Sequence, residues 1–328
     1  FDNGGDLWGW DVFHTRDNVR QTATDVMQVV RTLRGFDGKA RWAFDPTGRG
    51  AQGLAGDFDG DGVVDVGGSA PLHLMGGSLG GITGGVIAGV EPHLETAVAI
   101  VPGGMLSEIG TRSTLGGVRN AMVLRALGPL YYAAEGKLMV RLNVGQTESA
   151  ALAVHELPPL TPQDTVVLEN RTTGEHRCGA VQPSGTFRVT VACDAGDSLV
   201  LRVYRGPLAP LAPEGCVVPS DAPLLTIERF GLEVAHEGRT FAAGAPLVAL
   251  ADGFGQRRAT PDLRRFLGLS QIALDAADPM NWAPSWDGTR PMTYGTGETT
   301  RTQVMLMPSV GDPGVMIAAG VALARAAG

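Results

Sequence analysis

The sequence has few cysteines, no basic stripe and no long unbroken apolar run. Its longest apolar stretches are short or broken by glycine, so we expect no membrane-spanning segment. The net charge is −8, and no run of basic residues is available to meet the phosphates of a nucleic acid. The chain begins with Phe1, not Met, and shows no signal peptide. What remains is a globular protein with 44% hydrophobic residues, and its 328 residues suffice for two domains or for one with an insertion.

The three cysteines constrain the redox state only loosely. Cys178 and Cys193 flank Pro183-Ser-Gly185, a sequence that predicts a hairpin turn. A disulfide across this hairpin requires the two Cα atoms to lie within about 7 Å, and two buried thiols are the alternative. Cys216 would then be free, or paired with a cysteine outside this chain.

Strand-like and helical patterns alternate in the first part of the chain. Residues 16–34 carry apolar side chains at helical spacing, residues 70–75 are an apolar run, and residues 79–90 continue it with many glycines. Residues 96–101 are β-branched and end in Pro102-Gly-Gly104, which is typical of a buried parallel strand that meets a loop. The order strand, helix, strand predicts an α/β fold with a mostly parallel sheet and helices on both faces.

The pattern changes at about residue 138. Short runs rich in Val, Leu and Thr then recur about every ten residues, with turn signals between them, at 138–144, 151–155, 165–169, 187–192 and 198–204. This spacing predicts a small antiparallel β-sandwich. Helical spacing returns at 262–276, before a strand at 302–307 and a helix at 315–327. We therefore predict three parts: an α/β core in 1–137, an inserted sandwich in 138–210, and a linker, cap-like helices and the returning core in 211–328.

Residues 76–80 read Gly-Gly-Ser-Leu-Gly, the pattern G-x-S-x-G, between the apolar run and the glycine-rich helix. Glycines around Ser78 remove the Cβ atoms that would collide in a sharp strand-to-helix turn. This context predicts a nucleophile elbow, with the Leu79 backbone N–H as one donor to an oxyanion. A plain glycine turn is the alternative, because 47 glycines make chance matches common.

A serine nucleophile needs a general base and an acid that orients it. Asp312 directly follows the strand predicted at 302–307 and is our candidate acid; the alternative is a helix N-cap. The chain has six histidines, none of them after Asp312, at 14, 73, 93, 155, 176 and 236. We expect them in structural or solvated positions, with His236 at the end of a helical stretch. The sequence therefore offers a nucleophile and an acid without an evident base.

The acidic loop at residues 56–65 reads Gly-Asp-Phe-Asp-Gly-Asp-Gly-Val-Val-Asp. Its carboxylates occupy alternate positions of a calcium loop, and the ligands that we predict are Asp57, Asp59, Asp61, Asp65 and the Val63 carbonyl. Gly68 stands where an EF-hand has its glutamate, so a true EF-hand is not expected. The alternative is a solvated acidic loop without an ion.

Three segments resemble large bacterial extracellular lipases and esterases of the α/β-hydrolase fold. They are Gly76-Gly-Ser-Leu-Gly-Gly81, Arg16-Asp-Asn-Val-Arg-Gln21 and Asp278-Pro-Met-Asn-Trp282. The acidic loop is also similar to FG-GAP-type calcium loops. The resemblance covers about 1–110 and 260–328, and the segment between them matches nothing that we can name.

The resemblance implies further features. In that family the triad acid is an Asp in a Gly-Asp-x-x-Val context, which Gly311-Asp312-Pro-Gly-Val315 matches. The family's catalytic His would lie C-terminal to this chain, and its early strands with a His-Gly oxyanion motif would precede Phe1, so the chain would be an internal fragment. The implied substrate is an ester or lipid, and the implied location is extracellular or in the cell envelope.

Two classes of function are compatible with these residues. The first is a carboxylic ester hydrolase in which Ser78 forms an acyl-enzyme and Asp312 orients the base. For it we expect Ser78 and Asp312 about 6–8 Å apart, across a gap that holds one imidazole and none of this chain's histidines. The second is a calcium-stabilised extracellular binding or adhesion protein with a vestigial elbow. In both, calcium has a structural role, bracing the approach to the elbow.

Overall fold

Contacts between residues divide the chain into two units, which we describe one at a time. The computed structural model describes residues 8–9, 11–42, 53–115, 118–144, 149–207, 216–258 and 260–328. The α/β unit comprises Val12–Ser113 and Gly268–Gly328, and the antiparallel unit comprises Phe1–Asp11 and Thr114–Leu267. The division into 1–137, 138–210 and 211–328 remains a prediction about independently folding domains.

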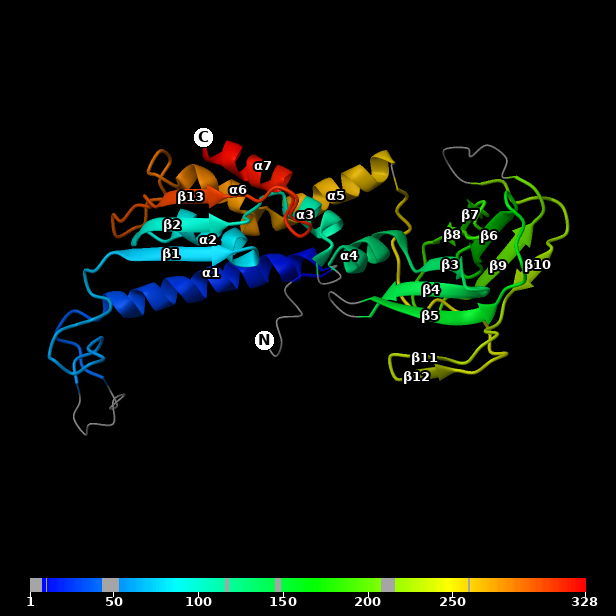
Figure 1. The fold of residues 1–328 in the computed structure, drawn as a ribbon, viewed down its shortest axis with the longest axis horizontal. Coiled ribbons are helices and arrows are strands. Elements are labelled where there is room, and N and C mark those ends of the chain that lie inside the picture. The colour runs from blue at the N-terminus through cyan, green and yellow to red at the C-terminus, as the bar shows by residue number, and fades with distance from the viewer. Residues whose placement is uncertain are drawn as a thin grey trace. The chain divides into compact units, whose positions relative to one another are not determined.

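The α/β unit is built on a three-stranded parallel sheet. Its strand order is β1 (Leu72–Gly77), β2 (Leu94–Ile100) and β13 (Gln303–Met307), and Figure 1 shows the three strands side by side. The register pairs Gly77 with Ile100 and Met307 with Ile100, so all three strands end at the same level. The parallel sheet predicted from the sequence is confirmed in this small form, and the antiparallel unit lies between β2 and β13 in chain order.

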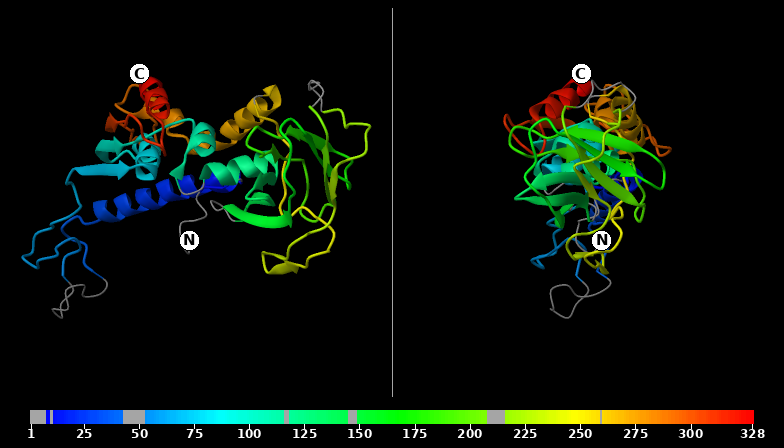
Figure 2. Two further views of the ribbon diagram at one scale, coloured as in Figure 1. Left: turned by 45° about the vertical axis from the view of Figure 1, so that its right-hand side comes forward. Right: turned by 90° about the vertical axis from the view of Figure 1, so that its right-hand side faces the viewer.

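Small residues allow close packing among the helical elements of this unit. The elements are α1 (Val12–Arg34), α2 (Leu79–Val90), α3 (Leu106–Arg112), η2 (Asp275–Ala277), α6 (Pro279–Trp282), η3 (Ala283–Ser285) and α7 (Ile317–Ala327). Helix α2 lies on β1 and β2, and α7 on β13; Figure 2 shows the same elements from two further directions. A Cβ at Gly89 of α2 would lie 2.6 Å from the Trp282 Cβ, so this close approach of α2 to α6 requires glycine. In the described ranges, no helix is both long and apolar enough to cross a membrane.

The sheet also has a solvent-exposed face. Side chains alternate between the two faces of a strand, and every second residue of β1 and of β13 is exposed. Met75, Met305 and Met307 are 73%, 58% and 45% exposed. Parallel sheets usually bury both faces under helices, and the sequence predicts helices on both faces here. That part of the fold prediction was wrong, because the described residues leave Met75, Met305 and Met307 exposed on one face.

The antiparallel unit contains two four-stranded sheets. One has the order β5-β4-β3-β8 and the other β10-β9-β6-β7, and β11 and β12 form a separate hairpin. Their bounds are β3 Leu130–Ala134, β4 Lys137–Asn143, β5 Ser149–Glu156, β6 Thr165–Asn170, β7 His176–Ala180, β8 Arg188–Val189, β9 Leu199–Tyr204, β10 Leu225–Ile227, β11 Val234–His236 and β12 Arg239–Phe241. Strands of both sheets contribute to one apolar core, which includes Tyr131, Val140, Leu168 and Leu201. Antiparallel strands separate from the parallel sheet are confirmed, although they extend beyond 138–210 at both ends.

Two helices accompany these strands. Helix α4 (Val118–Leu127) precedes β3 and packs against β4. Helix α5 (Pro261–Leu274) follows the last strand of the unit, and from Gly268 on its residues belong to the α/β unit. The helical end predicted at His236 was wrong. His236 is the last residue of β11 and pairs with Arg239 across a tight turn.

The disulfide suggested between Cys178 and Cys193 was also wrong. Cys178 pairs with Cys216, with the two Cα atoms 5.7 Å apart. The turn after β7 does not make a hairpin, because β7 and β8 belong to different sheets. Cys193 is buried as a free thiol, and its pKa is raised to about 12 by burial and by nearby carboxylates, Asp197 first among them.

Candidate functional site

Ser78 lies at the point where β1 ends and α2 begins, in a backbone conformation that serine rarely adopts. Its φ is 53° and its ψ is −117°. The Ser78 N–H donates to the Ile100 carbonyl of β2 at 2.8 Å. The Ser78 carbonyl accepts from Gly81 N at 2.9 Å and from Ile82 N at 3.0 Å. These bonds fix the turn at both ends and leave the Ser78 side chain exposed.

The surrounding glycines allow this turn. A Cβ at Gly76 would lie 2.1 Å from the Gly80 carbonyl oxygen, and a Cβ at Gly81 would lie 2.8 Å from the Ile100 carbonyl oxygen. No side chain fits at either position without moving the backbone. The strand, sharp turn and helix predicted from G-x-S-x-G are therefore present in the structure.

The neighbouring loop, after β2, is strained as well. Val101 has φ 51° and Met105 has φ 60°, and a positive φ is an outlier for a β-branched residue such as valine. Val101 N donates to the Met307 carbonyl at 2.9 Å, so the ends of all three strands are joined by hydrogen bonds. Backbone strain of this kind costs about 1–3 kcal/mol per residue and clusters at functional sites. The strain in this loop was not predicted from the sequence, where Pro102-Gly-Gly104 was the only signal for the loop.

A buried carboxylate anchors the same loop. Asp278 is fully buried; its Oδ2 accepts from Leu106 N at 2.9 Å and Gln271 Nε2 at 2.8 Å, and its Oδ1 accepts from Met280 N at 3.0 Å. Burial raises the pKa of Asp278 above its usual range, against the lowering effect of these hydrogen bonds. The Asp278-Pro-Met-Asn-Trp282 segment therefore supports the strained loop and the start of α3.

Asp312 follows β13, at the same edge of the sheet as Ser78. Its Oδ1 accepts hydrogen bonds from Gly314 N and Val315 N, both at 2.8 Å. The N-cap of α7 is Met316, so Asp312 stabilises the turn before the helix and does not cap it. Among the described residues, no group donates a hydrogen bond to Asp312 Oδ2.

One strand separates the two candidate residues. Ser78 follows β1 and Asp312 lies beyond β13, with β2 between them in the sheet. Neighbouring strands lie about 4.8 Å apart, so the ends of β1 and β13 are roughly 10 Å apart. This spacing is compatible with the expected gap of about 6–8 Å between the side chains, which stays a prediction.

The histidines of the α/β unit have other partners. His73 Nδ1 is 2.8 Å from Thr96 Oγ1, and His93 Nε2 is 3.2 Å from a Glu298 carboxylate oxygen. Among the described residues, which include all six histidines, none donates to or accepts from the Ser78 side chain. The Leu79 N–H is the first of helix α2 and therefore has no acceptor within that helix.

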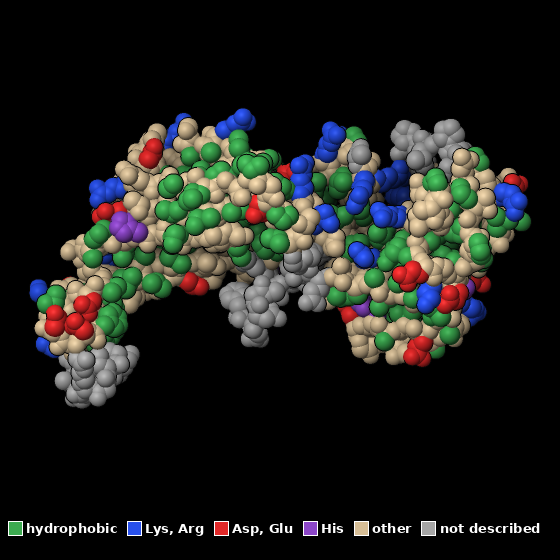
Figure 3. All heavy atoms as spheres, viewed as in Figure 1, with side chains coloured by type: hydrophobic (Ala, Val, Ile, Leu, Met, Phe, Trp, Pro, Cys, Tyr) green, Lys and Arg blue, Asp and Glu red, His purple; other side chains and the backbone are tan. Residues whose placement is uncertain are grey.

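The acidic loop brings three of its four aspartates together. Carboxylate oxygens of Asp57, Asp59 and Asp61 lie within 4.8 Å of one another, and acidic side chains gather at this end of the α/β unit in Figure 3. Asp57 is buried, and its two oxygens accept from Gly60 N at 2.6 Å and Gly62 N at 2.9 Å. Asp65 lies outside this group of three and accepts from Phe58 N at 2.7 Å. The group could hold an ion or remain a hydrogen-bonded acidic loop.

Comparison of the chain with protein-family models, curated proteins and solved structures finds no match. Function is therefore argued from the site alone.

Proposed function

We propose that this protein is a carboxylic ester hydrolase of the α/β-hydrolase type that acts through a serine nucleophile. The observation that carries the proposal is the conformation of Ser78, φ 53° and ψ −117°, between a parallel strand and a glycine-rich helix. A residue is held in such strain only where the surrounding structure imposes it, and the result here is an exposed hydroxyl at a sheet edge. A plain glycine turn would not need a serine in this position.

The chemistry is a two-step acyl transfer. The Ser78 oxygen attacks the ester carbon as its proton passes to an imidazole, and the carbonyl oxygen becomes an oxyanion near the Leu79 N–H. The intermediate collapses, and the bond to the alcohol breaks as the alcohol takes the proton from the imidazolium. Water then attacks the acyl-enzyme by the same route and releases the carboxylic acid and Ser78.

Asp312 is the residue that we assign to orient the imidazole. Two backbone N–H groups hold its Oδ1, which leaves Oδ2 to accept from an imidazole N–H. The resemblance to extracellular lipases implies that this histidine follows Asp312 in chain order. The strand order, with β2 between the two residues, supports this arrangement.

We further propose that the acidic loop binds calcium in a structural role. Asp57, Asp59 and Asp61 would supply carboxylate oxygens, with Asp65 and the Val63 carbonyl completing the set. A hard cation suits an all-oxygen donor set and would relieve repulsion among the carboxylates. The loop precedes β1, so the ion would brace the approach to Ser78. The Cys178–Cys216 disulfide supports the location that we propose, outside the cell or in its envelope.

The test is acylation of Ser78 by an activated ester. We would incubate the chain with p-nitrophenyl acetate, with and without free imidazole, and locate the acetyl group by peptide mass spectrometry. We expect a slow adduct on Ser78, faster with imidazole because the added base enters the gap before Asp312. The Asp312→Asn variant should lose most of the imidazole effect. Ser69→Ala, an exposed serine of the same unit, is the matched control.

Two outcomes would reject the hydrolase. One is that Ser78→Ala is acetylated at other residues as fast as the parent chain is acetylated. The other is that no acetyl group is found on Ser78 at any imidazole concentration. If the second occurred and calcium still raised the melting temperature, the calcium-stabilised binding protein would be the better interpretation.

A further inference from the structure

The antiparallel unit contains a pocket that the proposed hydrolase does not use. Its volume is about 730 Å³, within the range of small-molecule sites. Helix α4, strands β3, β4, β7 and β8, and the residues Gln256, Arg257, Arg258 and Thr260 contribute to its lining. All of these elements belong to this unit, so the pocket is complete within it.

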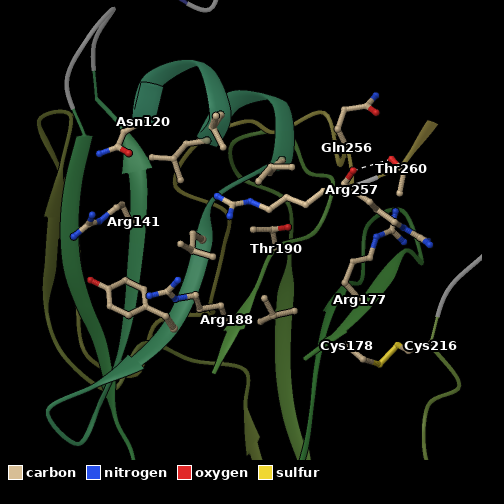
Figure 4. Close-up of a pocket in the computed structure, with 17 residues that line it drawn as sticks. Asn120, Arg141, Arg177, Cys178, Arg188, Thr190, Cys216, Gln256, Arg257 and Thr260 are labelled. Atoms are coloured by element: carbon tan, nitrogen blue, oxygen red, sulfur yellow. Dashed lines mark hydrogen bonds between the residues drawn. A yellow bond between two sulfur atoms is a disulfide. The ribbon is translucent and has the colours of Figure 1, made fainter. Parts of the chain in front are cut away.

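The charge of the pocket is opposite to that of the chain. Its lining residues include five arginines and no aspartate or glutamate, whereas the chain as a whole carries a net charge of −8. The arginines are Arg141, Arg177, Arg188, Arg257 and Arg258. Figure 4 shows Arg141 and Arg188 at one side of the pocket and Arg177 at the other, with Thr190 between them. Guanidinium groups converging on one cavity from separate strands favour a bound anion.

The ion pairs that the described residues form leave three of these arginines without a carboxylate partner. Arg141, Arg188 and Arg258 form no ion pair with any residue in the described ranges. Arg177 has a carboxylate of Glu175 at 3.8 Å, beyond hydrogen-bond distance, and donates to the His176 carbonyl at 3.0 Å. Burial lowers the pKa of Arg177, and the like charge of Arg257 lowers it further. An anion between them would offset both effects.

The remaining wall is apolar. Val123, Leu124 and Leu127 of α4 line the pocket together with Leu130 and Val189. Hydroxyl and amide groups, among them Thr190 and Asn120, supply further hydrogen bonds. A small inorganic anion would leave this wall uncovered, so the pocket suits a ligand with a charged head and an apolar body.

We propose that this pocket binds a phosphate monoester that carries an apolar group. A phosphate dianion offers three oxygens to converging guanidinium groups, and its geometry matches bidentate donation by arginine. The apolar group would lie against Val123 and Leu127. Such a ligand could be a soluble alkyl phosphate or the headgroup of a phosphatidic-acid-type lipid. The proposal is independent of Ser78 and does not depend on ester hydrolysis.

The test is calorimetric titration of the oxidised, full chain with octyl phosphate, ethyl phosphate, inorganic phosphate and octyl alcohol. We expect octyl phosphate to bind most tightly, up to about fourfold tighter per buried methylene than ethyl phosphate. Arg188→Ala should weaken octyl phosphate binding about 10-fold or more, because each hydrogen bond to a charged group contributes strongly. Arg239→Ala removes an exposed arginine of β12 outside the pocket and should change nothing.

Flotation with vesicles separates the two sources of this chemistry. Binding to phosphatidylcholine vesicles only when they contain phosphatidic acid would identify the lipid headgroup, and octyl phosphate binding without flotation would identify a soluble ligand. Equal affinity for octyl and ethyl phosphate would overturn the apolar part of the proposal. Octyl phosphate binding that is unchanged in Arg188→Ala, or equally weakened in Arg239→Ala, would overturn it entirely. Arg188 is exposed, so its replacement should not unfold the protein, which circular dichroism would verify.

Discussion

Replacing Ser78 by glycine should stabilise the α/β unit. The φ of 53° and ψ of −117° cost a residue with a Cβ about 1–3 kcal/mol, and glycine avoids this cost. Glycine loses more backbone entropy on folding, which offsets about 0.5–1 kcal/mol of the gain. The net expectation is a free energy of unfolding about 1 kcal/mol higher. Ser78→Ala retains the Cβ and should leave the stability nearly unchanged, because the Ser78 hydroxyl is exposed.

Urea unfolding followed by tryptophan fluorescence measures this change in the free energy of unfolding of the α/β unit. The antiparallel unit carries Trp8 and Trp10, so both are replaced by phenylalanine in every variant compared. The remaining tryptophans, Trp42, Trp282 and Trp286, lie in the α/β unit. Trp286 is buried and donates to the Gly85 carbonyl of α2 at 2.9 Å, so its emission reports the packing beside Ser78. Ser69→Gly, at an exposed position with negative φ, is the control and should destabilise slightly. If Ser78→Gly proved no more stable than Ser78→Ala, the argument that Ser78 is strained would be refuted.

Three further predictions concern the same unit. Burial raises the pKa of Asp278 in the folded protein, so as pH rises above about 3.8 this carboxyl ionises in the unfolded chain before it ionises in the folded one. The free energy of unfolding should therefore fall between about pH 3.8 and the raised pKa of the folded protein and then level off. Urea titrations at several pH values should show no such fall for Asp278→Asn. Calcium should raise the melting temperature, a chelator should reverse the rise, and Asp59→Asn should remove the effect. If calcium leaves the melting temperature of the parent protein unchanged, the predicted calcium site is disproved. Gly89→Ala should destabilise by about 1–3 kcal/mol because its Cβ would meet Trp282, whereas Gly80→Ala, with open space around it, should stabilise by up to about 1 kcal/mol; equal urea midpoints would contradict the packing argument.

Structure that depends on residues close together in the chain could be predicted from the sequence, and structure that depends on residues far apart could not. The turn at Ser78 was predictable because the need for glycine at 76 and 81 arises within a few residues. The parallel pairing of β1 with β2 was also predictable, since a single helix joins the two strands. The disulfide was missed because the partner of Cys178 depends on which sheet each strand joins, and no spacing between cysteines encodes that choice.

The strained loop and the arginine pocket illustrate the same limit. Val101 has a positive φ, and its N–H donates to the Met307 carbonyl, about two hundred residues later in the chain. The five pocket arginines are spread from Arg141 to Arg258, and none is close to another in sequence except the last two. Only the folding of two sheets around one core brings them to a common cavity.

The exposed methionines of the parallel sheet make that face susceptible to oxidants. A thioether accepts one oxygen to become a sulfoxide, and the reaction is fastest where the sulfur is accessible. Met75, Met305 and Met307 are all largely exposed, whereas Met122 in the antiparallel unit is buried. Peroxide would therefore make the exposed methionines of this face polar while leaving the buried thioether intact. Because methionine sulfoxide can be reduced back to methionine, the polarity of this sheet surface could be raised and lowered again without a change in sequence.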